Sequence, residues 1–144
     1  MSQFRPTRII LHCSATEDSG TVSWAAIRRF HKTECAWADI GYHFGIEIVG
    51  TDYEVFVGRF LDTAGAHCQD HNHDSIGVCF VGNFDNKAPS LDQWQLGCRL
   101  VRSLCYVYCI GHDRVFGHRE FTNKKTCPGK MFDLDLFRAQ LNPY

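Results

Sequence analysis

The chain has 144 residues, close to the ~150 residues of a typical domain, so we expect one domain spanning residues 1–144. Hydrophobic residues make up 44% and charged residues 22%, a composition typical of a globular protein and not of a disordered one. The formal net charge is −1, which leaves no basic excess to drive nucleic-acid binding. No stretch approaches the ~18 apolar residues of a membrane span, so we expect no membrane insertion.

Eight cysteines and eight histidines stand out in this composition. In a secreted chain, eight cysteines would indicate a disulfide framework. The N-terminal residues Met1–Thr7 hold no apolar run of signal-peptide length, and Ile9–Leu11 is short and is followed at once by His12. We therefore expect synthesis in a reducing cytoplasm, with most thiols free. Four of them are expected to pack as small core hydrophobes, namely Cys79, Cys98, Cys105 and Cys109.

The first half of the chain mixes strand and helix patterns. Ser23 stands at the N-cap position of a predicted helix, because Trp24, Ile27 and Phe30 follow it at helical spacing. Short apolar or β-branched runs predict the strands, and a Gly-containing turn joins the second to the third as a hairpin. The fourth is continuously apolar, which is typical of a buried central strand. The expected strands are residues 7–12, 42–49, 54–58 and 75–81.

The second half opens with a longer helical pattern that starts at Leu91 and is expected to end at Gly111. Its apolar stripe recurs every three or four residues. Residues 115–118 predict a brief strand, and Asp133–Leu141 predicts a last helix. The order of these elements predicts an α/β (α+β) fold, a single domain with a mixed central β-sheet flanked by helices. The stripe consists of Leu91, Trp94, Cys98, Val101, Cys105 and Tyr108.

Three potential metal ligands lie where a predicted strand ends or a loop begins. His12 closes the first strand, His118 closes the last one, and Cys127 follows in a tight loop. Two imidazoles and a thiolate suit zinc, and three protein ligands leave the fourth tetrahedral position open, as in a catalytic site. A single histidine at a strand end is more often a polar surface residue. Two other groups offer alternative ligand sets, residues 67–73 and Cys105 with Cys109 and His112.

The remaining histidines near these positions have simpler interpretations. His43 alternates with Tyr42 along the predicted strand, so its side chain points to the opposite face, where we expect a structural, hydrogen-bonded role. His31 is expected on the surface of its helix. By the same alternation, Cys13 is expected to face away from His12.

Five short blocks occur in one order along the chain, and the resemblance that they carry covers nearly all of it, from about Thr7 to Phe132. Together they resemble the zinc-dependent N-acetylmuramoyl-L-alanine amidases, the family that includes phage lysozyme-type amidases and animal peptidoglycan recognition proteins. The resemblance implies the fold of that family, which agrees with the mixed sheet predicted above. The blocks are residues 12–16 (HCSAT), 39–44 (DIGYHF), 73–78 (HDSIGV), 117–119 (GHR) and 125–129 (KTCPG).

The resemblance also implies roles for individual residues. Tyr42 corresponds to the tyrosine that is needed for cleavage beside the metal. Lys125, two residues before the cysteine ligand, corresponds to the second catalytic position. His67 lies in a loop that resembles one lining the substrate groove. One zinc ion per chain would be bound by His12, His118 and Cys127.

The function implied by the resemblance is zinc-dependent hydrolysis of the amide bond between N-acetylmuramic acid and L-alanine in peptidoglycan, as in a phage or prophage endolysin. The expected partner is peptidoglycan or a muropeptide, and the expected state is a monomer. Without an export signal, the protein would reach the wall through a holin or a secretion apparatus. Two alternatives stay open: a recognition module that binds muropeptides without cutting them, and a cytosolic amidase that recycles wall fragments.

Overall fold

A mixed five-stranded sheet forms the centre of the computed structural model, which describes residues 3–17 and 23–142. The strand order is β3-β2-β4-β1-β5. β1 runs parallel to both β4 and β5, β2 runs parallel to β4, and β3 pairs with β2 as an antiparallel hairpin. The strands are β1 (Arg8–Cys13), β2 (Phe44–Val49), β3 (Asp52–Val57), β4 (Ser75–Phe80) and β5 (Val115–Gly117).

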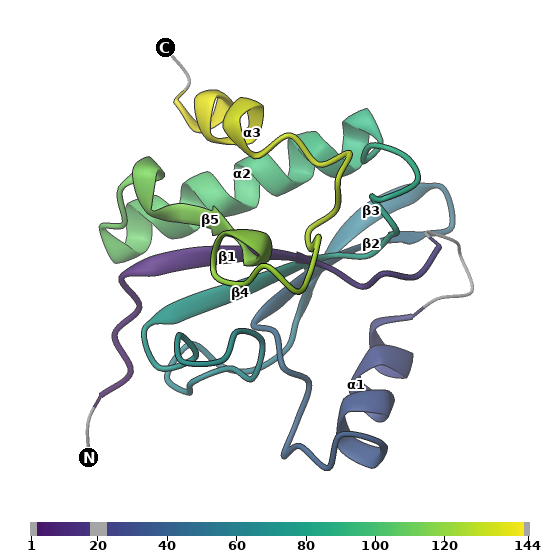
Figure 1. Ribbon diagram of the computed structural model, residues 1–144, viewed down its shortest axis with the longest axis vertical. Coiled ribbons are helices and arrows are strands. Elements are labelled where there is room, and N and C mark those ends of the chain that lie inside the picture. Colours follow the sequence, from purple (N-terminus) through teal and green to yellow (C-terminus); the bar gives the residue numbers. More distant parts are fainter. Residues whose placement is uncertain (1–2, 18–22, 143–144) are drawn as a thin grey trace.

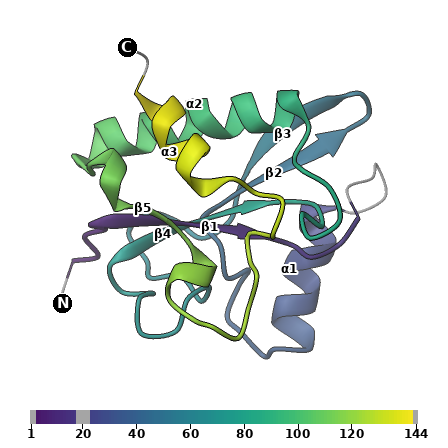
Figure 2. The same ribbon diagram turned by 45° about the horizontal axis from the view of Figure 1, so that its top comes forward.

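The helices lie on both faces of this sheet. Helices α2 and α3 cover one face, and α1 lies on the other (Figures 1 and 2). The predicted mixed sheet flanked by helices is therefore confirmed. Within the described ranges, no helix has the length and apolar character needed to cross a membrane. The helices are α1 (Trp24–Thr33), α2 (Leu91–Tyr108) and α3 (Leu134–Leu141), with single 3-10 turns η1 (His112–Arg114) and η2 (His118–Glu120).

Polar side chains begin all three α-helices. The Ser23 hydroxyl accepts a hydrogen bond from the backbone N–H of Ala26 at 3.0 Å, which confirms the predicted start of α1. Ser90 caps α2 and Asp133 caps α3 in the same way. Such caps satisfy backbone donors that have no partner within the helix, and each contributes about 1 kcal/mol.

The end of α2 differs from the prediction. The helix stops at Tyr108, and Cys109 takes a left-handed conformation with φ of 54°, whereas Gly111 has an ordinary φ of −65°. The N–H of Ile110 bonds to the carbonyl of Cys105 at 2.9 Å, which satisfies a free carbonyl at the helix end. The prediction that the helix ends at Gly111 was therefore wrong. The prediction that Cys109 packs in the core was also wrong, because this residue is exposed.

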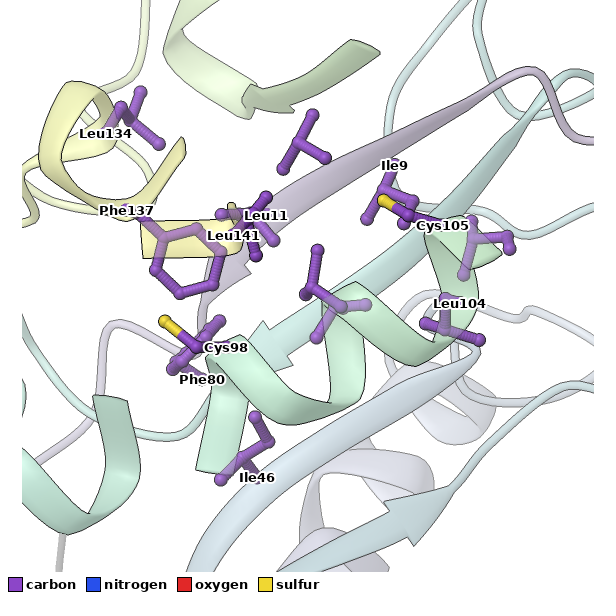
Figure 3. Close-up of a cluster of buried hydrophobic side chains, with 14 of the residues drawn as sticks. Ile9, Leu11, Ile46, Phe80, Cys98, Leu104, Cys105, Leu134, Phe137 and Leu141 are labelled. Atoms are coloured by element: carbon purple, nitrogen blue, oxygen red, sulfur yellow. The ribbon is translucent and has the colours of Figure 1, made fainter. Parts of the chain in front are cut away.

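Side chains along the central strands alternate between a hydrophobic face, toward α2 and α3, and the opposite face, toward α1. Ile9 and Leu11 of β1 point toward α2 and α3, whereas His12 lies on the other side of the sheet. In β4, Phe80 joins the hydrophobic layer and Cys79 faces α1. Figure 3 shows this layer between the sheet and the two helices. The expected burial of Cys79, Cys98 and Cys105 is confirmed.

An aromatic cluster joins α2, α3 and the sheet. The Phe137 ring lies 5.9 Å from Phe80, 5.6 Å from Phe132 and 5.1 Å from Trp94, measured between ring centroids. Tilted and edge-to-face pairs of this kind contribute about 0.5–1.5 kcal/mol each beyond their buried area. The cluster therefore fixes α3 against the sheet.

The Phe137→Ala substitution should lower the free energy of unfolding by about 3–5 kcal/mol, because it removes a fully buried ring and leaves a cavity. Denaturant unfolding followed by circular dichroism measures this change. The control is Tyr106→Ala on α2, where the side chain is 87% exposed, and it should change stability by less than about 0.5 kcal/mol. Equal effects of the two substitutions would contradict the packing described.

Candidate metal centre and active site

Three potential metal ligands converge at one end of β1. The ligand atoms of His12, His118 and Cys127 all lie within 4.8 Å of one another. Pairing of β1 with β5 places Leu11 opposite Gly117, so His118, the next residue, comes beside His12 with ring centroids 4.7 Å apart. The Nδ1 atom of His12 lies 3.7 Å from Sγ of Cys127. The structure thus brings together the three residues predicted as ligands.

The chemistry of these three groups fits a soft divalent cation. Burial lowers the pKa of His12 well below its ordinary value, and burial together with the charge of Lys125 lowers the pKa of His118. Both imidazoles are therefore neutral near pH 7 and offer a lone pair. The pKa of the Cys127 thiol is raised by a hydrogen bond with the side chain of Cys13 and by burial, so its thiolate form requires a nearby cation.

Hydrogen bonds hold the Cys127 loop on both sides. One carboxylate, Asp85, accepts from the Thr126 hydroxyl at 2.8 Å and from the backbone N–H of Lys130 at 2.9 Å. These two hydrogen bonds lower the pKa of the Asp85 carboxyl. The backbone N–H of Arg119 donates to the carbonyl of Cys127 at 2.7 Å. The loop that carries the third ligand is thus tied to both neighbouring segments.

Tyr42 lies beside the proposed ligands, two residues before β2 begins. Its ring centroid is 5.2 Å from that of His12, and the ring stacks on Trp24 with centroids 6.2 Å apart. Burial and the neighbouring thiols of Cys79 and Cys127 raise the pKa of Tyr42 well above its ordinary value. The side chain therefore stays a protonated phenol and keeps an O–H donor at this position.

The Arg59 side chain holds the segment before Tyr42 in place through hydrogen bonds to backbone carbonyls. Arg59 donates through Nε to the carbonyl of Ile40 at 2.8 Å, and through its terminal nitrogens to the carbonyls of Ala64 and Asp39 at 2.9 and 3.3 Å. Its backbone N–H also donates to the carbonyl of Tyr42 at 3.0 Å. Arg59 was not singled out from the sequence, because arginine in a polar loop gives no local signal.

His67 lies directly against the His12 ring. Its Nδ1 atom is 2.8 Å from Nε2 of His12, and its Nε2 atom is 3.4 Å from the Ser75 hydroxyl oxygen. The side chain is 8% exposed, and burial followed by the charge of His43 lowers its pKa to about 3. His67 was predicted to line the substrate groove, and it lines the adjoining pocket. Its contact with His12 was not predicted.

A pocket of about 600 Å³ opens beside the proposed ligands. Lys125 lies on its wall with His118 and His67, so a cationic residue lines the same space as the imidazoles. Sequence reasoning missed most of the remaining wall, because its residues come from three separate loops. These residues are Trp37, Ala66, Cys68, Gln69, Asp70, Asn72, Phe121, Thr122 and Lys124.

The other histidine predictions have mixed outcomes. His43 is fully buried, accepts from the backbone N–H of Gly77 and contacts the carbonyl of Thr63 at 2.9 Å, which confirms its structural role. The surface placement of His31 was wrong, because its half-buried ring accepts from the N–H of Gly41 and packs against Tyr42. Among the described residues, neither alternative ligand set forms a group within metal-binding distance.

The cysteines follow the expected pattern in most cases. All eight are free thiols. Cys13 packs against the hydrophobic layer, as expected, and its backbone N–H donates to Sγ of Cys127 at 3.3 Å. Seven thiols therefore lie outside the group of proposed ligands.

Comparison with known proteins identifies the family. A family model described as N-acetylmuramoyl-L-alanine amidase matches residues 2–130. The chain belongs to this amidase family. It is 43% identical to the endolysin of Klebsiella phage KP32 over 131 residues, which cover 89% of this chain and 82% of that one. The resemblance deduced from the five sequence blocks is thus confirmed.

Further comparisons find similarity to a second endolysin and to a solved amidase structure. It is 46% identical to the endolysin of Enterobacteria phage T3 over 89 residues, 59% of this chain, but spans little more than half (56%) of that relative's length. A solved structure of the amidase LysC from Clostridium intestinale superimposes with a TM-score of 0.85 at 28% identity, over 96% of this chain and 87% of the other. The predicted amidase-like fold is confirmed.

Cys127→Ser should remove most of the metal bound by the purified protein, because a serine hydroxyl is a much weaker ligand than a thiolate for a soft cation. Elemental analysis after dialysis measures the metal content per chain. Cys35→Ser is the matched control, since Cys35 lies outside the ligand group and should leave the content unchanged. Full metal retention by Cys127→Ser would exclude Cys127 as a ligand.

Proposed function

We propose that this chain is a zinc-dependent amidase that hydrolyses the bond between N-acetylmuramic acid and L-alanine in peptidoglycan. The observation that carries the proposal is the convergence of His12, His118 and Cys127 beside a protonated Tyr42 in a chain of the amidase family. The likeness to phage endolysins supports a wall-degrading role after release from the cytoplasm. We further propose that the sheet and its helices act as one monomeric catalytic domain.

The ligand set favours zinc over harder cations. Two neutral imidazoles and one thiolate form a borderline-soft set, whereas magnesium and calcium prefer oxygen ligands. Three protein ligands also leave one tetrahedral position for water or substrate. Zinc bound there would polarise the amide carbonyl and lower the pKa of a bound water toward about 7. The thiolate of Cys127 would offset part of the metal charge, which makes other donors near the scissile bond more important.

The protein's own side chains supply those donors. As the amide is attacked, negative charge develops on its carbonyl oxygen, and a group that meets this charge stabilises the transition state more than the substrate. Lys125 lines the pocket and supplies positive charge there. The phenol of Tyr42 supplies an O–H donor and a site through which a proton can pass. The pocket walls hold the stem peptide across these groups.

Release of stem peptides from purified cell wall tests the enzyme against the recognition module. The metal-loaded protein should free peptides that begin with L-alanine, a chelator should stop release, and added zinc should restore it. Wall binding without any release would identify a recognition module instead. Cleavage of soluble muropeptides combined with failure on intact wall would favour the recycling amidase.

Lys125→Ala should keep zinc but lower turnover by about 100–1000-fold, the usual cost of removing one donor to a developing oxyanion. Peptide release and zinc content are measured on the same preparation. Lys87→Ala is the control, because Lys87 is an exposed loop residue outside the pocket, and its activity should match that of the unsubstituted protein. Full activity of Lys125→Ala would show that this lysine has no catalytic role.

A further inference from the structure

A chain of hydrogen bonds leads away from the proposed ligand His12 into the protein. Nε2 of His12 meets Nδ1 of His67 at 2.8 Å, and Nε2 of His67 meets the Ser75 hydroxyl oxygen at 3.4 Å. The Ser75 hydroxyl in turn lies 2.5 Å from the backbone carbonyl of His71. His12, His67 and Ser75 are buried, so no bulk water competes for these bonds.

The carbonyl at the end of the chain determines where each proton lies. A carbonyl only accepts, so the single hydroxyl proton of Ser75 is donated to His71. The Ser75 oxygen is then free to accept, which requires the proton of a neutral His67 on Nε2. Nδ1 of His67 is consequently a bare acceptor and receives the Nε2 proton of His12. The lone pair of His12 is thereby directed to Nδ1, the atom that lies 3.7 Å from Cys127.

We propose that His67 is a positioning residue that, with Ser75 and the His71 carbonyl, fixes the tautomer and ring orientation of the metal ligand His12. This inference rests on the zinc site of the proposed function. Fixing the partner of the second ring nitrogen makes a histidine ligand more basic and removes its rotational freedom. The role differs from substrate binding, because the atom involved is Nδ1, and its partner is Nε2 of His12.

The surrounding backbone is shaped to hold the His67 ring in this place. A Cβ atom added to Gly77 would lie 2.6 Å from the ring, and one added to Gly65 would lie 2.5 Å from it, so two glycines make room for the imidazole. The Asn72 side-chain oxygen accepts from the backbone N–H of His67 at 2.7 Å and from that of Cys68 at 2.9 Å. The two glycines thus leave a close-fitting space for the His67 ring, and the hydrogen bonds to Asn72 hold its backbone in place.

Ring tautomers can be observed directly by long-range ¹H–¹⁵N correlation spectra of the histidines. In the metal-free protein, both His12 and His67 should carry their proton on Nε2, and added zinc should shift the Nδ1 signal of His12. His43 is an internal reference, since its Nδ1 accepts from the N–H of Gly77 and its proton must also lie on Nε2. A proton on Nδ1 of His67, or zinc binding through Nε2 of His12, would overturn the proposal.

Two substitutions separate positioning from simple packing. His67→Phe keeps a planar ring but offers no acceptor, so zinc affinity measured by competition with a chelating dye should fall by about 10–100-fold. His67→Gln places an amide carbonyl that accepts and an N–H that donates, and it should recover most of that affinity. Unchanged affinity in His67→Phe, or an equal loss in both variants with the His43 signals intact, would contradict the proposal.

The outcomes also separate this inference from the proposed function. Zinc affinity and tautomers are measured without any substrate. A protein that shows the expected tautomers and zinc affinities but releases no peptide from wall would overturn the amidase proposal alone. A protein that cleaves wall with the opposite tautomers would overturn the role of His67 and leave the amidase proposal standing.

Discussion

The alternation of side chains along β1 is the constraint on which both the hydrophobic layer and the metal centre depend. β1 is paired on both edges, with β4 and β5, so its register is fixed over nearly its whole length. A slip of one residue would exchange Leu11 and His12 between the two faces. Packing of Leu11 against the helices therefore also aims His12 at Cys127, and the same burial that stabilises the sheet sets the geometry of the proposed ligands.

Much of this arrangement could be predicted because its signals are local. The continuous apolar run at residues 75–81 predicts a central strand, and Ser23 marks the start of a helix through one short-range hydrogen bond. The candidate site was harder to predict from the sequence. His12 and His118 are far apart in the sequence, and spacing alone gives only two histidines at strand ends. The order of the five sequence blocks, and no periodicity, led to the prediction that the two histidines and Cys127 form one ligand set.

What the sequence did not reveal depends on the paths of loops. The contact of His67 with His12 exists because Asn72 and two glycines hold the loop above β4, and no spacing rule encodes that path. The end of α2 is similar. Ile110 is 6% exposed, and burying its side chain requires the chain to leave the helix at Cys109, a residue type that rarely adopts positive φ. Tertiary packing overrides local preference at both places.

The separation of the proposed ligands along the chain has a thermodynamic consequence. His12 belongs to the first strand, whereas Cys127 belongs to a loop near the last helix, so the unfolded chain has no preformed group of ligands. Any ion that the native site binds therefore pulls the folding equilibrium toward the native state. At a free concentration 100 times the dissociation constant, this linkage adds about 2.7 kcal/mol to the free energy of unfolding. The midpoint temperature of thermal unfolding should therefore rise with the concentration of free metal.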